Sequence, residues 1–254
     1  MARITRSMYH KDLQPAYHSG RVITWLAQRN WGMRMMHRFM MKPMVGNNID
    51  GIDCGEFHIP STTTPGHRIR ARIYKPADAS GPLPAMLYIH GGGYGVGVPE
   101  QAHPFFEDLM NRRDVVIVAP AYRLSLQGYP YPNGLNDCYD TLLYMKDNGE
   151  KLGIRADRFI IAGHSGGGGL TAALTLKTID SGAADIAFQM PIYPMLDHRM
   201  TTKSAREMVG TAMWDRHSNA LAWENYLGHL KGDIPDYASP ALRQDPVGLP
   251  PTIS

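Results

Sequence analysis

The chain has 254 residues, of which 43% are hydrophobic and 19% are charged, and its formal net charge is +3. This composition is ordinary for a soluble globular protein that is long enough to bury a sizeable core in one large α/β domain. Residues 1–30 lack the apolar core of a signal peptide, and no run of 18 apolar residues occurs, which argues against secretion and against a membrane span. We therefore expect a cytoplasmic protein without stable membrane insertion.

The two cysteines, Cys54 and Cys138, lie far apart in the chain. No Cys-x-x-Cys pair and no histidines at metal-ligand spacing accompany them. This pattern favours free, buried thiols in a reducing compartment. We expect neither a disulfide nor a metal site.

Charge is distributed unevenly along the chain. Residues 1–42 contain eight Lys or Arg side chains and one acid, Asp12, so this segment carries +7 and the rest of the chain −4. The basic residues alternate with Trp25, Trp31, Phe39 and several methionines, as on an amphipathic helix. We expect a packed or lid-forming helix and no nucleic-acid partner.

Residues 15–44 show helical spacing of apolar side chains, and Pro43 ends the pattern. The face of this predicted helix is rich in methionine, a flexible side chain that adapts to varied apolar partners. Two interpretations are open. The methionines either fill an ordinary core or form part of a cap over an acyl pocket.

The rest of the chain alternates between strand and helix patterns. Residues 56–60 and 68–74, joined by a turn at 62–67, have the alternation of two half-buried antiparallel strands. The later elements are apolar strands at 84–89, 115–119, 158–162 and 186–193, and helices at 101–112, 136–152, 170–176 and 211–226. This order predicts an α/β fold with a mostly parallel, doubly wound sheet. No repeat or linker divides the chain, so we expect a single domain over 1–254.

A Gly-x-Ser-x-Gly motif separates the apolar strand pattern at 158–162 from the helix pattern at 170–176. Its residues are Gly163, His164, Ser165, Gly166 and Gly167. A motif of this kind between a strand and a helix is the nucleophile elbow, a tight turn that holds its serine in a strained conformation. The glycines at 163 and 167 let strand and helix pass close to the turn. The motif predicts Ser165 as a catalytic nucleophile, with the His164 side chain directed away from Ser165 Oγ.

A second glycine motif follows the strand at 84–89. Its residues are His90, Gly91, Gly92, Gly93 and Tyr94. Backbone N–H groups fixed in advance stabilise the oxyanion of acyl transfer, and loss of one donor costs about 3–4 kcal/mol. We expect the N–H groups of Gly92, Gly93 and Gly166 to form this oxyanion hole, and His90 to order the loop by hydrogen bonding. A phosphate-binding loop is disfavoured, because no Gly-Lys-Ser/Thr follows.

Together the two motifs resemble those of the hormone-sensitive-lipase-like branch of α/β-hydrolase carboxylesterases. Further matching stretches are Tyr122-Arg123-Leu124, Tyr129-Pro130-Tyr131-Pro132 with Asp137, Gly153-Ile154 with Asp157-Arg158, Tyr193-Pro194-Met195-Leu196-Asp197, Tyr237-Ala238-Ser239-Pro240-Ala241-Leu242 and Gly248-Leu249-Pro250-Pro251-Thr252. The family's usual elbow is Gly-Asp-Ser-Ala-Gly-Gly, and here His164 and Gly166 replace the acid and the alanine.

The resemblance implies the α/β-hydrolase fold and a serine esterase. Its substrate would be a small-molecule ester with a short-to-medium acyl group, hydrolysed through an acyl-enzyme intermediate without a cofactor. The resemblance also implies a helical cap, built here from residues 1–45 and about 198–232.

The resemblance further implies that part of the machinery lies outside this sequence. In the family, a Gly-Leu-Pro-Pro phrase leads into a strand that the catalytic acid follows, and the catalytic histidine lies on a later loop. Here three residues follow the phrase at 248–251, whereas the remaining elements would need about 50–60 residues. We expect the last strands, the acid and the base to be absent. A fragment, a natural truncation and a two-chain protein each account for this, and we favour the fragment.

Residues within the chain offer a substitute triad that rests on chain order alone. Asp197 follows the strand at 186–193 and would act with His198, His217 or His229. The same strand would also form an exposed sheet edge, which favours pairing with another chain in a homo-oligomer. A second function is left open by the missing acid and base, namely an inactive hydrolase-fold protein that binds apolar ligands or partners.

Overall fold

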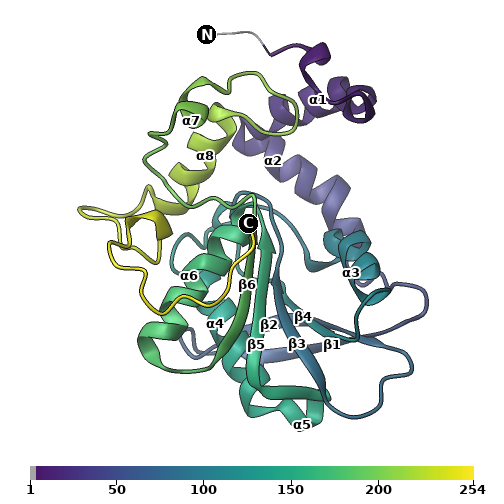
Figure 1. Ribbon diagram of the computed structural model, residues 1–254. Helices are drawn as coiled ribbons and strands as arrows, with labels where there is room; N and C mark the ends of the chain where they lie inside the picture. The colour runs from purple at the N-terminus through teal and green to yellow at the C-terminus, as the bar shows by residue number, and fades with distance from the viewer. Residues whose placement is uncertain (1–3) are drawn as a thin grey trace.

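The computed structural model describes residues 4–254. A sheet of six strands in the order β1-β2-β4-β3-β5-β6 forms its centre, with helices on both faces (Figure 1). The strands are β1 (Ile52–Pro60), β2 (Arg68–Pro76), β3 (Leu83–Ile89), β4 (Val116–Pro120), β5 (Ile154–His164) and β6 (Ile186–Ile192). The first two strands pair antiparallel with each other, and β2 pairs antiparallel with β4. The pairs β4-β3, β3-β5 and β5-β6 are parallel, as the apolar patterns predict.

Both faces of the sheet carry a hydrophobic core, because successive side chains of a strand point to opposite faces. On β3, Leu87 and Ile89 belong to one cluster together with side chains of α4 (Asn133–Asp147) and α6 (Gly166–Ser181). Met86 and Tyr88 belong to the other cluster, which includes Phe106 of α3 (His103–Met110). The predicted doubly wound arrangement is therefore confirmed.

The helices differ from the predicted bounds, and for two of them the structure shows the local cause. The segment 15–44 is divided because Arg29 is extended (φ −141°, ψ 131°), which separates α1 (Tyr17–Ala27) from α2 (Asn30–Met36). Beyond the break, Gly32 packs onto the backbone of Leu26, where a Cβ atom would lie 2.3 Å from the carbonyl oxygen. The helix predicted at 211–226 begins later, as α8 (Arg216–Leu227), because the Asp215 side chain accepts a hydrogen bond from Ser218 N–H and caps it.

The remaining elements are short. They are the turns η1 (Arg6–Met8), η2 (Lys11–Ala16), η3 (His37–Met41, a π-helical turn), η4 (Lys42–Met44), η5 (Pro99–Ala102), η6 (Ser125–Gln127) and η7 (Pro240–Leu242), and the helices α5 (Gly149–Leu152) and α7 (Lys203–Glu207). The predicted helix at 136–152 is thus shared between α4 and α5.

Residues 4–45 and 198–232 lie together above the sheet and form what we call the upper layer (Figure 1). Backbone and side-chain hydrogen bonds join the two segments. Thr24 Oγ1 donates to the Thr211 carbonyl at 2.7 Å, and Met213 N–H donates to the Gly20 carbonyl at 2.9 Å. The upper layer is therefore built from parts of the chain that are far apart in sequence.

The edge of β6 is less exposed than the sequence suggests. Gln189 N–H donates to the Pro251 carbonyl at 3.0 Å, and Ile253 N–H donates to the Gln189 carbonyl at 3.2 Å. Thr252 thus lies parallel to β6 and partly covers this edge. Pairing with another chain through β6 stays a prediction, with fewer free backbone groups to support it.

Within residues 4–254 both cysteines are free, with Cys138 buried and Cys54 half-buried. No group of three or more His, Cys, Asp or Glu residues in this part of the chain is arranged to hold a metal ion. In the same residues, every helix is too short or too polar to cross a lipid bilayer.

Candidate active site

Ser165 lies in a strained turn between β5 and α6. Its backbone angles, φ 56° and ψ −117°, fall in a region that non-glycine residues rarely adopt. Two backbone hydrogen bonds hold the turn in this conformation. Ser165 N–H donates to the Ile192 carbonyl at 3.0 Å, and the Ser165 carbonyl accepts from Met195 N–H at 3.1 Å. The loop after β6 therefore holds the elbow, as strained sites require.

Close backbone contacts explain the glycines that flank the turn. A Cβ atom on Gly163 would lie 2.5 Å from the carbonyl oxygen of Gly167. A Cβ atom on Gly167 would lie 2.1 Å from the carbonyl oxygen of Ile89. Strand β5, strand β3 and helix α6 thus approach each other more closely than any side chain allows, and Ser165 sits where they meet.

The glycine loop after β3 lies directly beside the elbow. A Cβ atom on Gly91 would be 3.4 Å from Ser165 Cβ, and one on Gly166 would be 3.2 Å from the backbone nitrogen of Gly93. Among the hydrogen bonds of residues 4–254, none uses the N–H of Gly92, Gly93 or Gly166 as donor. The two motifs that the sequence singles out are therefore brought together, and the three N–H groups are left unused.

His90 is buried beneath this loop and braces it. Its Nδ1 lies 2.9 Å from the Gly91 carbonyl oxygen, and its ring stacks on Tyr122 with 4.3 Å between ring centroids. The Tyr122 hydroxyl donates to the His90 carbonyl at 3.0 Å. Burial lowers the pKa of His90 to about 4, so the ring is neutral near pH 7. These contacts fit the predicted role of ordering the loop.

Tyr94 links the glycine loop to the rest of the site, a role that the sequence motif does not reveal. Its hydroxyl donates to the Met195 carbonyl at 2.9 Å, and its ring stacks on Tyr226 of α8 with 4.0 Å between centroids. Like Ser165, Tyr94 has a positive φ, 61°. An aromatic residue after three glycines is a weak signal, because only the fold shows what the ring contacts.

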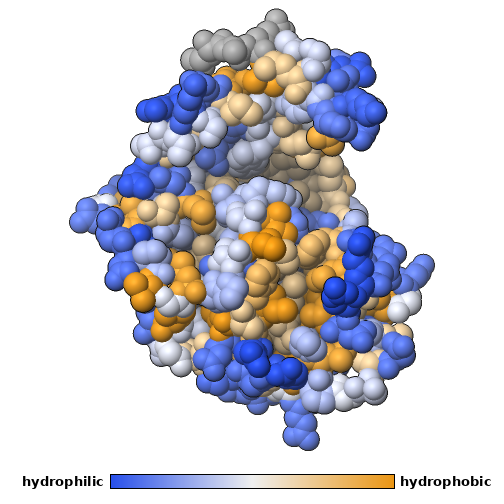
Figure 2. All heavy atoms as spheres, viewed as in Figure 1, coloured by the Kyte–Doolittle hydropathy of each residue, from blue (hydrophilic) through white to orange (hydrophobic). Residues whose placement is uncertain are grey.

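A cavity of about 1300 Å³ opens between the upper layer and the sheet. Figure 2 shows the hollow between the two parts of the molecule. Ser165 and the glycine loop line its floor, and Trp214, Trp223 and mainly apolar side chains of the upper layer line its walls. Its methionines are Met8, Met33, Met36, Met41, Met195, Met208 and Met213. The methionine-rich face therefore agrees with both interpretations, core filling and a cap over a pocket, because Met33 and Met36 are buried and also line the cavity.

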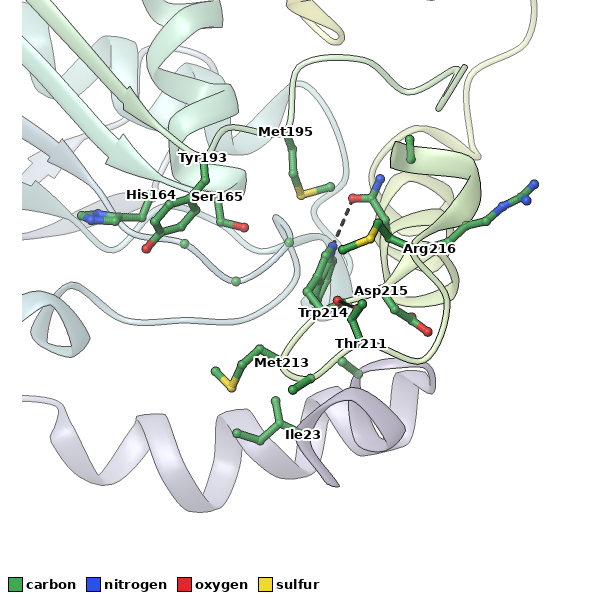
Figure 3. A pocket seen from close by; sticks show the side chains of 18 of the residues that line it. Ile23, His164, Ser165, Tyr193, Met195, Thr211, Met213, Trp214, Asp215 and Arg216 are labelled. Atoms are coloured by element: carbon green, nitrogen blue, oxygen red, sulfur yellow. Dashed lines mark hydrogen bonds between the residues drawn. The ribbon is translucent and has the colours of Figure 1, made fainter. Parts of the chain in front are cut away.

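Trp214 is the most prominent wall residue that sequence analysis missed (Figure 3). It lies in the turn before α8, where its indole Nε1–H donates to Asn219 Oδ1 at 3.2 Å. Asp215, the next residue, accepts hydrogen bonds from Gln28 Nε2 at 2.9 Å and from Gly210 N–H at 3.0 Å. An Asp directly before a helix is a recognisable N-cap signal, but its partner Gln28 has no sequence signal.

The histidines of residues 4–254 do not reach Ser165 Oγ, which has no hydrogen-bond partner in this part of the chain. His164 lines the cavity, yet its side chain points away from Ser165 (Figure 3), and its Nδ1 bonds the Tyr88 hydroxyl. This orientation matches the prediction. Burial lowers the pKa of His164.

The substitute triad is not assembled. The Asp197 carboxylate pairs with Arg199, whose Nε lies 2.8 Å from Oδ1. His198 Nδ1 lies 2.9 Å from Ser239 Oγ, and His217 and His229 are exposed on the upper layer. Asp197 lines the cavity, but Arg199, two residues later, occupies both of its carboxylate oxygens. Within residues 4–254 no imidazole is hydrogen-bonded to Asp197 or to Ser165.

Comparison with known proteins identifies the fold. A family model described as the alpha/beta hydrolase fold matches residues 86–253. The chain is 30% identical over 171 residues to carboxylesterase NlhH of Mycobacterium tuberculosis, covering 66% of this chain and 52% of the relative. It is 31% identical over 157 residues to ethyl acetate hydrolase of Pseudomonas putida, covering 61% and 49%.

Solved structures agree with this match. A bacterial heroin esterase superposes with a TM-score of 0.81 at 30% identity, over 94% of this chain and 78% of that one. The chain spans about half the length of the curated relatives it matches.

Proposed function

Because the chain belongs to the hormone-sensitive-lipase-like family of α/β-hydrolase carboxylesterases, we propose that it hydrolyses carboxylic esters with Ser165 as nucleophile. The observation that carries this proposal is a strained, half-buried serine that lines one apolar cavity together with a glycine loop whose backbone N–H donors are unused. Strain and preorganised donors are features that folding alone does not require.

In the proposed reaction, Ser165 Oγ attacks the ester carbonyl carbon and forms a tetrahedral intermediate. The N–H groups of Gly92, Gly93 and Gly166 stabilise the negative charge on the former carbonyl oxygen. The alcohol leaves with a proton, and the acyl group stays on Ser165 until water attacks the acyl-enzyme and releases the acid. Ser165 needs a base for both steps, which comes from outside residues 4–254 because no imidazole within them reaches Oγ.

We propose a short-to-medium acyl group as the occupant of the cavity. The walls are mainly apolar, and the volume of about 1300 Å³ leaves ample room for it, since an ordinary ligand pocket has roughly 300–1,000 Å³. We propose that the upper layer acts as a cap over this acyl site, with its methionines adapting to different acyl chains. The name of one relative, ethyl acetate hydrolase, denotes a short-acyl ester and agrees with this range.

A second function is supported by the unpartnered hydroxyl of Ser165. A hydrolase fold with a large apolar cavity and no base at its serine would bind apolar ligands without turning them over. A serine without its base is a weak nucleophile, although an oxyanion hole and binding alone retain roughly 10³–10⁴-fold catalysis over water. This alternative predicts binding that is independent of Ser165.

One experiment separates the two functions. The protein is incubated with a fluorophosphonate probe and with p-nitrophenyl esters of graded acyl length, with Ser165→Ala as control. Esterase function predicts labelling of Ser165 and turnover that both disappear in the variant. Absence of labelling and turnover in the folded wild type, together with undiminished binding of a fluorescent fatty acid by the variant, would support the binding function.

A further inference from the structure

The outward face of the N-terminal helices carries large apolar side chains that are exposed to solvent. Trp25 is 49% exposed, Trp31 53% and Phe39 67%. The other exposed apolar residues from α1 to η3 are Val22, Met35 and Met40. Trp25 and Trp31 contact each other edge to face with 5.4 Å between ring centroids, which makes the surface continuous across the break between α1 and α2. We call these six residues and the basic side chains beside them the outer face.

The charge of the outer face has a single sign. Residues 13–49 contain no Asp or Glu, whereas Arg21, Arg29, Arg34, Arg38 and Lys42 all lie within them. None of these five forms an ion pair within residues 4–254. The Arg29 guanidinium lies over the Trp25 ring, 4.5 Å from its centroid, and that of Arg38 lies 5.6 Å from the Phe39 centroid. Aromatic and cationic groups are therefore interleaved.

The opposite side of the same helices is also apolar. Ile23, Ala27, Met33 and Met36 line the cavity or pack into the core. A helix with a single apolar side buries that side against the core of its own protein. Helices α1 and α2 have a second apolar side, which the core contacts do not account for.

We propose that the outer face binds the surface of an anionic lipid bilayer. Tryptophan and other aromatic side chains favour the headgroup region of a membrane, and basic side chains are attracted to anionic lipids. A second copy of the chain fits less well, because symmetric pairing would place five cations against five cations with no acid between them. The binding is peripheral, since no helix of residues 4–254 is able to span the bilayer.

Membrane binding would serve the proposed esterase, but it does not depend on that function. The inner sides of α1 and α2 line the cavity, and a helix with its side chains is about 10–12 Å wide. A protein bound through its outer face would hold its cavity within about one helix diameter of the lipid. Esters dissolved in the bilayer would then be the substrates nearest to Ser165.

Vesicle flotation tests the surface without any measurement of activity. The full chain is mixed with vesicles of phosphatidylcholine alone and of phosphatidylcholine with phosphatidylglycerol, at low and high salt. We expect binding to the anionic vesicles that weakens with salt. Replacing Arg34, Arg38 and Lys42 by Gln should weaken binding about 100-fold, since each basic side chain near an anionic surface contributes about fivefold. Trp31→Ser with Phe39→Ser should weaken it at least about tenfold.

A matched control changes the same number of charges elsewhere. Arg113, Arg155 and Arg158 are exposed on the α/β body, and their replacement by Gln should leave vesicle binding as in the wild type. Equal loss in the control, or no binding of the wild type to anionic vesicles at low salt, would overturn the proposal. Self-association that depends on Trp31 and Phe39, without vesicle binding, would also overturn it and assign the surface to a second copy.

Discussion

The indole ring of Trp214 lies against the backbone of Gly93, so that a Cβ atom on Gly93 would be 2.8 Å from Trp214 Cη2. The upper layer therefore contacts the glycine loop at the residue proposed as an oxyanion donor. This contact couples the position of the cavity wall to the position of a backbone N–H group.

A double-mutant cycle measures that coupling. Gly93→Ala should cost about 1–2 kcal/mol for its φ of 56°, and about 1–3 kcal/mol more for the overlap with Trp214. In the Trp214→Ala background the overlap disappears and the strain remains. We expect a coupling energy of about 1–3 kcal/mol in urea denaturation. Additive effects of the two substitutions would contradict the contact.

The elbow predicts a sharp contrast between two glycine substitutions. Gly167→Ala places a Cβ atom 2.1 Å from the Ile89 carbonyl oxygen, so helix α6 and the end of strand β3 must separate, and we expect a loss of more than about 3 kcal/mol. Gly182→Ala meets no atom within 4 Å and carries only the strain of its φ of 61°, at about 1–2 kcal/mol. Chemical denaturation of both variants checks the difference, and similar losses would contradict the close approach.

Asp215 joins the two segments of the upper layer. Its carboxylate accepts from Gln28, Gly210 and Ser218. Asp215→Ala leaves these donors unpaired and removes the cap of α8, which should cost about 3 kcal/mol. Gln28→Ala removes a single bond between segments and should cost about 1 kcal/mol.

Hydrogen exchange locates the effect of these two variants. Amides of α1 should exchange faster in both, because α1 is held through Gln28. Unchanged protection of α1 would show that other contacts, such as that of Thr24 with the Thr211 carbonyl, carry the attachment.

The buried imidazole of His90 predicts a pH-dependent stability. Burial lowers its pKa to about 4, whereas in the unfolded chain it is about 6.5. Between these values the unfolded state binds a proton that the folded state does not, so stability falls as the pH falls from about 6.5 to 4. The contribution is fully present above pH 6.5 and amounts to about 3 kcal/mol.

Chemical denaturation at pH 7 and pH 4 tests this slope. Between pH 7 and pH 4, the free energy of unfolding should fall by about 3 kcal/mol more in the wild type than in His90→Gln. His217→Gln, at an exposed position on α8, is the control and should follow the wild type. Identical slopes for the wild type and His90→Gln would contradict a buried neutral ring.

The sequence predicted the sheet and the two glycine motifs well, because both leave local signals. Continuous apolar runs such as 84–89 belong to strands covered on both faces, and close approaches such as that of Gly167 to Ile89 exclude every side chain. It missed the break between α1 and α2. A single glycine such as Gly32 is a weak signal for a break, and only the structure shows that Gly32 packs against the backbone of Leu26.

By itself, the sequence determined the α/β-hydrolase fold, the strained elbow around Ser165 and the neighbouring glycine loop. These features follow from the size of single residues and from short apolar periods, which act over a few positions of the chain. Only the tertiary structure decided the cavity wall around Trp214 and the exposure of Trp31 and Phe39. Those depend on contacts such as Gln28 with Asp215, which are 187 residues apart and form only when the remote segments pack together.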